Sequence, residues 1–172
     1  MGACARMSDW SVIHSSNDMA WRTPQRLFDL LDSEFHFDLD AAASADNALC
    51  ENYFTAQEDA LTRDWSRYKS VWCNPPYGRE LHRWMAKAFI ESRHGPTVVM
   101  LVMACTETRW WRDYAWRADE IRLVQGRIKF TRSTGEPAGA APKGSAVIIF
   151  HPSWNGPPRV VLMNQCTTKT GF

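Results

Sequence analysis

Residues 97–104 form a continuous apolar run that ends beside polar residues. A run in which polar and apolar side chains do not alternate is typical of a central strand that is buried on both faces. Residues 146–150 form a second run of this kind. Helical patterns lie between the strand-like segments. An alternation of strands and helices predicts an α/β sandwich with a mainly parallel sheet and helices on both of its faces.

Three helices are predicted from residue spacing. Apolar residues recur at intervals of three and four over residues 81–89, as on the buried face of an amphipathic helix. Another helix is expected to begin at Thr23-Pro24, with the Thr23 hydroxyl as its cap and Pro24 at the first helical position. A third, rich in aromatic residues, is expected from Thr106 onward. Further strands are expected over residues 35–40, 52–54, 120–124, 127–130 and 159–163.

The length of 172 residues and the apolar content of 45% fit one domain with a substantial core. We expect this domain to span residues 21–165, between a mobile arm over residues 1–20 and a frayed tail over residues 166–172. The net charge of +1 predicts that any nucleic-acid surface is a local patch. No apolar run is long enough to span a membrane and no signal sequence opens the chain, so a cytoplasmic protein is expected. The five cysteines and five histidines show no ligand spacing, so no metal site is expected.

Asn74-Pro75-Pro76-Tyr77 follows a short apolar run and precedes the predicted helix over residues 81–89. The two prolines make this loop stiff, and each pushes the residue before it towards an extended conformation. The Asn74 side-chain oxygen and the Pro75 carbonyl can therefore project together as two fixed acceptors, with the flat ring of Tyr77 beside them. Two acceptors beside an aromatic ring suit a planar exocyclic amine such as that of adenine. Holding both amine hydrogens out of the ring plane would direct the nitrogen lone pair at an electrophile, which is catalysis by positioning.

Two carboxylates, Asp38 and Asp40, lie at the end of the strand predicted over residues 35–40, and the small residues 41–45 follow them. A turn of small residues lets a ligand approach the backbone closely. Acidic side chains at a strand end can bind an ammonium group or ribose hydroxyls, although solvated acids are also common there. The ends of parallel strands meet at one edge of a sheet, so Asp40 and Asn74 are expected to share one site.

The Asn-Pro-Pro-Tyr motif resembles the catalytic motif of S-adenosylmethionine-dependent amino-methyltransferases, which methylate adenine N6, cytosine N4 or a glutamine side chain. The chain is most similar to the small phage-type DNA N-6-adenine methyltransferases (Dam family), and the similarity covers roughly residues 20–150. The supporting stretches are Trp21-Arg22-Thr23-Pro24, Phe37-Asp38-Leu39-Asp40-Ala41-Ala42, Asp64-Trp65, Gly126-Arg127 with Phe130, and Ser145 to Phe150. The family's glycine-rich turn is replaced here by alanines.

This resemblance implies a Rossmann-like S-adenosylmethionine-dependent methyltransferase fold with an antiparallel C-terminal strand. It also implies methyl transfer from S-adenosylmethionine to adenine N6 in DNA, without a metal. The implied catalytic residues are Asn74, Pro75, Pro76 and Tyr77. The implied cofactor contacts are Thr23 and Pro24 at the methionine end, Asp38, Asp40 and Ala41 at the small-residue turn, and either Asp59 or Asp64 at the cofactor adenine.

Basic residues near the predicted site are candidates for contacts with DNA phosphates. The stretch over residues 131–144, rich in glycine and proline, is expected to be a flexible loop, and it is either a phosphate-binding loop or an ordinary solvated one. The candidates are Arg79, Arg127, Lys129, Arg132 and Lys143. An amino-methyltransferase that acts on RNA or on a protein glutamine, and a non-catalytic nucleic-acid-binding module of the same fold, are the alternatives. Both a monomer and a homodimer are compatible with the sequence.

Overall fold

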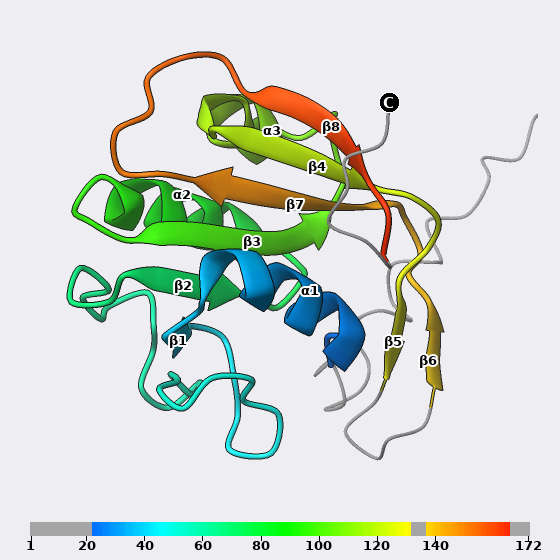
Figure 1. Ribbon diagram of the computed structural model, residues 1–172, viewed down its shortest axis with the longest axis horizontal. Coiled ribbons are helices and arrows are strands. Elements are labelled where there is room, and N and C mark those ends of the chain that lie inside the picture. The colour runs from blue at the N-terminus through cyan, green and yellow to red at the C-terminus, as the bar shows by residue number, and fades with distance from the viewer. Residues whose placement is uncertain (1–21, 132–136, 166–172) are drawn as a thin grey trace, which may run out of the picture.

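Six strands form one sheet in a computed structural model that describes residues 22–131 and 137–165 (Figure 1). The predicted arm over residues 1–20 and the predicted tail over residues 166–172 lie outside the described residues. In order across the sheet, the strands are β1 (Leu39–Asp40), β2 (Ser70–Cys73), β3 (Thr97–Met103), β7 (Ser145–Phe150), β4 (Glu120–Val124) and β8 (Arg159–Met163).

The sheet is mainly parallel, as predicted, because β7 is the one strand among the six that runs against the others. It pairs antiparallel with β3 on one side and with β4 on the other, whereas β8 pairs parallel with β4. The expected antiparallel strand is therefore not the last strand of the chain. The chain leaves β4 and re-enters the sheet as β7 from the same end, so β7 must run backwards. The connection over residues 151–158 starts and ends at the end of the sheet where β4 begins, so β8 starts beside Glu120 and runs parallel to β4.

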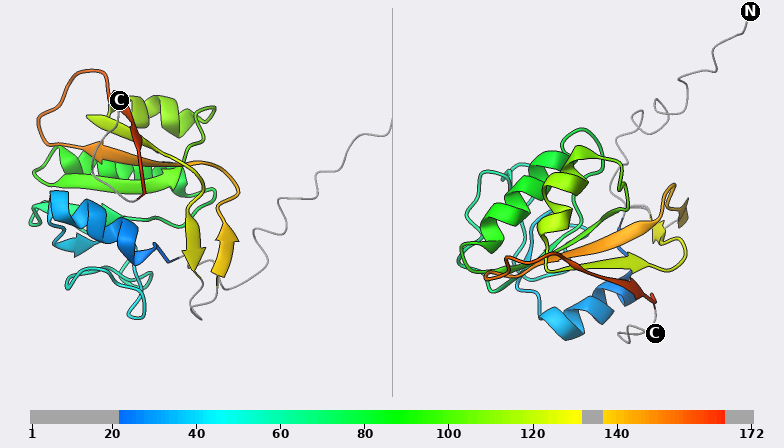
Figure 2. Two further views of the ribbon diagram at one scale, coloured as in Figure 1. Left: turned by 45° about the vertical axis from the view of Figure 1, so that its right-hand side comes forward. Right: turned by 90° about the horizontal axis from the view of Figure 1, so that it is seen from above.

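Helices cover both faces of the sheet, as expected. The helix α1 (Gln25–Phe35) lies on one face, and α2 (Leu81–Ser92) and α3 (Arg109–Asp113) lie on the other (Figure 2). A short 3-10 helix, η1 (Ala115–Arg117), follows α3. Side chains of β3 alternate between the two cores: Val98, Met100 and Val102 pack on the α2 side, and Val99 and Leu101 on the α1 side. This arrangement confirms that the apolar run over residues 97–104 is a strand buried on both faces.

The strand predicted over residues 35–40 is mostly wrong. The helix α1 continues to Phe35, which lies one turn beyond the buried Leu31, and His36 ends the helix in a left-handed conformation at φ 51. Only Leu39 and Asp40 form a strand, and both are buried. The helical repeat of apolar residues thus extends further than the local alternation suggested. The short strand predicted over residues 52–54 is reduced to a single parallel bridge between Asp40 and Tyr53.

A two-stranded antiparallel hairpin of β5 (Lys129–Thr131) and β6 (Pro137–Ala140) extends from the main sheet near the start of α1 (Figure 1). The stretch over residues 131–144 was expected to be one flexible loop, but residues 137–140 pair with β5 and so form a strand. Residues 132–136 lie outside the described residues. Among the helices that the structure describes, none is long and apolar enough to cross a membrane.

Candidate active site

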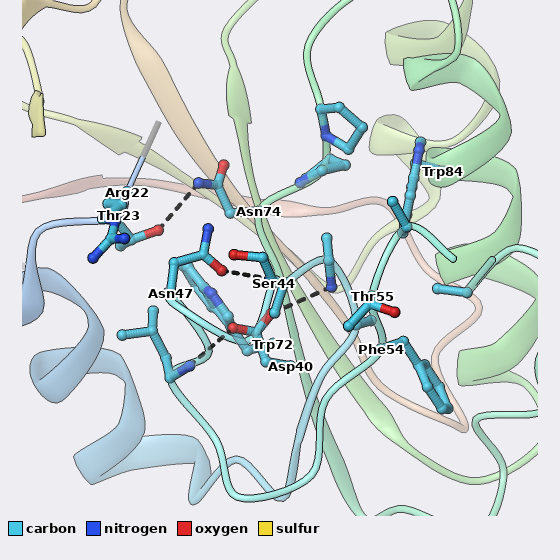
Figure 3. A pocket seen from close by; sticks show the side chains of 18 of the residues that line it. Arg22, Thr23, Asp40, Ser44, Asn47, Phe54, Thr55, Trp72, Asn74 and Trp84 are labelled. Atoms are coloured by element: carbon cyan, nitrogen blue, oxygen red, sulfur yellow. Dashed lines mark hydrogen bonds between the residues drawn. The ribbon is translucent and has the colours of Figure 1, made fainter. Parts of the chain in front are cut away.

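A cleft of about 630 Å³ lies at the carboxyl ends of β1 and β2 (Figure 3). Asp40 is the last residue of β1, and Asn74 directly follows β2. Because β1 and β2 are parallel neighbours, both residues reach the same edge of the sheet and both line the cleft. The sequence therefore correctly placed Asp40 and Asn74 together. The volume is in the range of sites that hold small molecules and cofactors.

The four motif residues at positions 74–77 all line this cleft. The Asn74 side-chain Nδ2 donates a hydrogen bond to the Thr23 hydroxyl at 3.1 Å (Figure 3). The Tyr77 hydroxyl donates to Asn74 Oδ1 at 3.2 Å. Burial raises the pKa of Tyr77 above its usual range, so its hydroxyl stays protonated and remains a donor. The amide of Asn74 is thus held between two hydroxyl groups.

Thr23 does not cap α1, contrary to the sequence-based expectation. Pro24 occupies the N-cap position of that helix, and no side chain makes a capping hydrogen bond there. The Thr23 hydroxyl faces the cleft instead, and the Thr23 side chain is largely buried. Pro24, the other expected contact in this segment, is not among the residues that line the cleft.

The hairpin contacts the same loop. The ring of Phe130 on β5 meets the ring of Tyr77 edge to face, with 6.5 Å between centroids. Thr131, the next residue of β5, pairs through its backbone with Arg22, which lines the cleft beside Thr23. The hairpin, the start of α1 and the 74–77 motif are therefore linked by direct contacts.

Asp40 is a buried carboxylate, with 3% of the residue exposed. It accepts hydrogen bonds from the backbone N–H groups of Ala42 at 3.3 Å and Leu49 at 3.2 Å. Burial raises the pKa of Asp40 to about 6, and these two hydrogen bonds lower it less than burial raises it. The small-residue turn over residues 41–43 lines the cleft next to this carboxylate, with Ala41 fully buried. A cationic ligand group in the cleft would favour the ionised form of Asp40.

Asp38 lies outside the cleft, unlike Asp40. Its carboxylate accepts hydrogen bonds from the backbone N–H groups of Lys69 and Ser70, both at 3.0 Å. Asp38 therefore fixes the start of β2 against β1, at the end of the strands opposite to the motif. Both acids were expected as cofactor contacts from the sequence, but of the two only Asp40 lines the cleft.

Of the two acids expected near a cofactor adenine, the structure brings only Asp59 into the cleft. Asp59 adopts a left-handed backbone conformation with φ 49 and is exposed. Asp64 is also exposed and does not line the cleft. A hydrogen bond from Ser66 lowers the pKa of Asp64, which is the behaviour of an acid in a local turn.

The basic residues expected to contact DNA have different surroundings. Lys129 is exposed on β5, and Arg79 is exposed two residues after the motif. The Arg127 guanidinium donates to the backbone carbonyl of Ala141, and Lys143 forms an ion pair with Glu107 at 2.8 Å. Arg132 lies outside the described residues.

Several residues that line the cleft were not singled out from the sequence as site residues. Arg22 has a buried Nε atom with no hydrogen-bond partner within the described part of the chain. Asn47 accepts a hydrogen bond from the backbone N–H of Ser44 at 2.7 Å and so closes the small-residue turn. The sequence offered one signal for each: Arg22 is a basic residue next to a predicted helix start, and Asn47 follows a serine by three residues. The others are Leu49, Phe54, Thr55, Ala56, Ala60, Trp72 and Trp84.

Comparison with known proteins gives consistent matches. The family described as DNA N-6-adenine-methyltransferase (Dam) matches residues 11–170. A DNA N-6-adenine-methyltransferase of Escherichia phage T1 is 31% identical over 147 residues, which cover 76% of this chain and 61% of the relative. The enzyme of the same name from Haemophilus phage HP1 is 34% identical over 138 residues, which cover 77% of this chain and 78% of that relative. The chain thus spans less than two thirds of the length of the phage T1 relative. The resemblance inferred from the sequence is confirmed.

Proposed function

This chain belongs to the DNA N-6-adenine-methyltransferase (Dam) family, and from that premise we propose that its cleft transfers a methyl group from S-adenosylmethionine to adenine N6 in DNA. The observation that carries this proposal is the meeting of Asp40 and the 74–77 motif in one cleft at the ends of two parallel strands. Use of S-adenosylmethionine is implied by the family. We also propose that the sheet is a Rossmann-like methyltransferase sheet, since ligands of such sheets bind at this edge.

The chemistry of the cleft fits S-adenosylmethionine. The buried carboxylate of Asp40 suits the cofactor's ammonium group, and the unsatisfied Nε of Arg22 suits its carboxylate. At the other end of the cleft, Phe54 and Trp84 offer apolar surface to an adenine ring (Figure 3). Asp59 also lines the cleft and offers an acceptor to the adenine amino group. When bound there, the cofactor supplies an electrophilic methyl group on a positively charged sulfur.

The motif would hold the target amine. Asn74 Oδ1 and the Pro75 carbonyl each accept one hydrogen of the adenine amino group, which directs the nitrogen lone pair out of the ring plane. A carbonyl oxygen has two lone pairs, so accepting from Tyr77 is compatible with accepting from an amine as well. The nitrogen forms a bond to the methyl carbon, the carbon–sulfur bond breaks with its electrons passing to sulfur, and one amine proton leaves to solvent. The protein contributes fixed acceptors and position rather than a strong base.

A duplex substrate would need its target base extruded before it reaches the cleft. The Tyr77 ring lines the cleft and offers a stacking surface for that base. The β5–β6 hairpin contacts the motif through Phe130 and carries the exposed Lys129, so we assign the DNA backbone to this side of the cleft. The charge on the hairpin is local, in keeping with a net charge of only +1 for the chain.

The test is incubation of the protein with S-adenosylmethionine carrying a labelled methyl group, in parallel with DNA, RNA and a glutamine-containing protein substrate. Nucleoside and amino-acid analysis then locates the label. We expect it in N6-methyldeoxyadenosine alone. Label in RNA or in glutamine would support an amino-methyltransferase with another substrate. Failure to bind S-adenosylmethionine or its product S-adenosylhomocysteine would support a non-catalytic nucleic-acid-binding module.

A further inference from the structure

Thr23 stands at a helix start but does not act as a helix cap. A threonine at such a place usually bonds to a backbone N–H of the first turn. Here the side-chain hydroxyl bonds to Asn74 Nδ2 at 3.1 Å, and Thr23 is 8% exposed. The sequence separation is 51 residues, so this contact exists only in the folded site. Helix α1 forgoes a capping hydrogen bond while the hydroxyl is committed to the catalytic motif.

The amide of asparagine has two orientations of nearly the same shape, which exchange its oxygen and its nitrogen. Only one orientation places the amide oxygen, an acceptor, where it can bind an amine hydrogen. The other orientation places the amide NH2 group there, which can only donate. The neighbours of Asn74 distinguish the two orientations. A phenol is a good donor and a poor acceptor, since its oxygen lone pair is delocalised into the ring, whereas an aliphatic hydroxyl is a good acceptor. The hydroxyl of Tyr77 therefore favours the amide oxygen on its side, and that of Thr23 favours the amide nitrogen on its own.

Thr23 is itself held by rigid backbone. On its N-terminal side, the Arg22 N–H donates to the Thr131 carbonyl at 2.9 Å, and the return bond from Thr131 to Arg22 is 3.4 Å. On its C-terminal side, the Pro24 carbonyl accepts from the N–H groups of Leu27 and Phe28 in the first turn of α1. The backbone of Thr23, and with it the position of the hydroxyl, is therefore fixed by helix α1 on one side and by the hairpin on the other.

We propose that Thr23 is a positioning residue, whose hydroxyl fixes the amide of Asn74 in the orientation that turns its oxygen towards the target amine. The proposal rests on the proposed methyl transfer. It differs from the role that the family resemblance implied, because Thr23 then acts on Asn74 and not on the cofactor. It also means that the backbone pairing of Arg22 with Thr131 helps to set the geometry of the catalytic loop.

The test uses Thr23→Val, which keeps the shape and removes the hydroxyl, and Thr23→Ser, which restores the hydroxyl without the methyl group. Single-turnover methylation of DNA is measured at saturating cofactor and DNA, and S-adenosylhomocysteine binding is measured by calorimetry. We expect Thr23→Val to be about tenfold slower, the size of effect of one lost hydrogen bond. The variant's affinity for S-adenosylhomocysteine should stay within about twofold of that of the wild type, because no hydrogen bond to the cofactor is removed. Thr23→Ser should recover most of the rate.

A double-mutant cycle separates positioning from general damage to the site. If Thr23 acts through Asn74, then Thr23→Val should cost almost nothing more in an Asn74→Ala background. Additive losses, no recovery with serine, or weaker S-adenosylhomocysteine binding at an unchanged rate would each overturn the proposal. If Thr23→Val does not fold, Thr23→Ala serves in the same cycle. An active wild type with an equally active Thr23→Val overturns this inference alone, whereas an inactive wild type overturns the proposed function as well.

Discussion

Asn74 is the one residue of the 74–77 motif with a side-chain amide, and its Oδ1 atom is the proposed acceptor of the target amine. The Asn74→Ala variant removes the Oδ1 atom but leaves Asp40 and the small-residue turn intact. We expect single-turnover methylation to fall about a hundredfold or more, as for the loss of one preorganised hydrogen-bonding group in a transition state. The affinity for S-adenosylhomocysteine should be unchanged, because the proposed cofactor contacts lie on other residues. A near-normal rate in this variant would contradict the assigned role of Asn74.

Asp40 predicts a pH dependence of cofactor binding. Its pKa in the ligand-free protein is raised to about 6 by burial, and an ammonium group beside it would lower that pKa. Binding should then release a proton at acid pH. The affinity should fall by about tenfold for each pH unit well below pH 6 and level off above pH 7. Calorimetry from pH 5 to 7.5 measures this, and Asp40→Asn should bind more weakly at pH 7.5 with a flat profile. Asp59→Asn is the control, since an exposed acid at the adenine end should leave the slope intact.

At the scale of single residues, the sequence was informative where chemistry and strand position coincided. Asp40 and Asn74 could be placed together because both directly end a strand. Asp38, two residues before Asp40, could not be separated from it, because its partners at residues 69 and 70 are set by the register of β1 on β2. The bond from Asn74 to Thr23 was also beyond sequence reasoning, since the capping pattern around Pro24 points to the opposite use of that hydroxyl.

At the scale of elements, the hairpin is expected to carry part of the DNA contact. Lys129→Ala should reduce DNA affinity and lower the slope of log affinity against log salt by about 0.9, the value for one lost phosphate contact. The matched control is Lys69→Ala. Lys69 is also exposed, but it precedes β2 at the end of the strand away from the motif. Binding isotherms at several salt concentrations measure both slopes. Equal slopes for the wild type and Lys129→Ala would exclude this lysine from the DNA surface.

A buried ion-pair network joins α1 to the sheet and predicts a difference in stability between two arginines. Arg122 on β4 is 5% exposed and bonds to Glu34 of α1 and to Glu120, which is 8% exposed. Arg159 bonds to the same Glu120, but its own side chain is 67% exposed. Arg122→Ala should lower the free energy of unfolding by about 3 kcal/mol or more, because it leaves a buried carboxylate with one exposed partner. Arg159→Ala should cost less than about 1 kcal/mol.

Urea denaturation of both variants measures this difference, and comparable losses would show that burial of Arg122 does not matter.

The helices and strands differ in how well the sequence predicts them. The long, regular elements α2, β3 and β7 were found close to their observed limits, because burial on one or two faces leaves a strong pattern. The short element β6 was missed, since it is ordered by pairing with β5 rather than by its own composition.

At the scale of the whole molecule, all the cleft-lining residues within the described ranges lie between Arg22 and Trp84. The second half of the chain completes the sheet and supplies the hairpin. The class of fold followed from the alternation of elements, but the strand order did not. The place of β7 between β3 and β4 depends on the end from which the chain re-enters the sheet. The path of the connection between β4 and β7 decides this, and no sequence pattern predicted that path.

This division predicts how the cofactor should act on stability. A ligand in the cleft would contact the start of α1, the ends of β1 and β2, and α2. These elements come together only in the folded protein, so the unfolded chain should not bind the ligand. S-adenosylhomocysteine at a hundred times its dissociation constant should therefore add about 2.7 kcal/mol to the free energy of unfolding. For a chain of this size, that should raise the melting temperature by roughly 5 to 10 °C. Adenosine at the same concentration is the control, since it would occupy only the end near Phe54 and Trp84 and should stabilise less. No shift in the melting temperature at this concentration would show that the folded protein does not bind S-adenosylhomocysteine, which would contradict the proposed cofactor site.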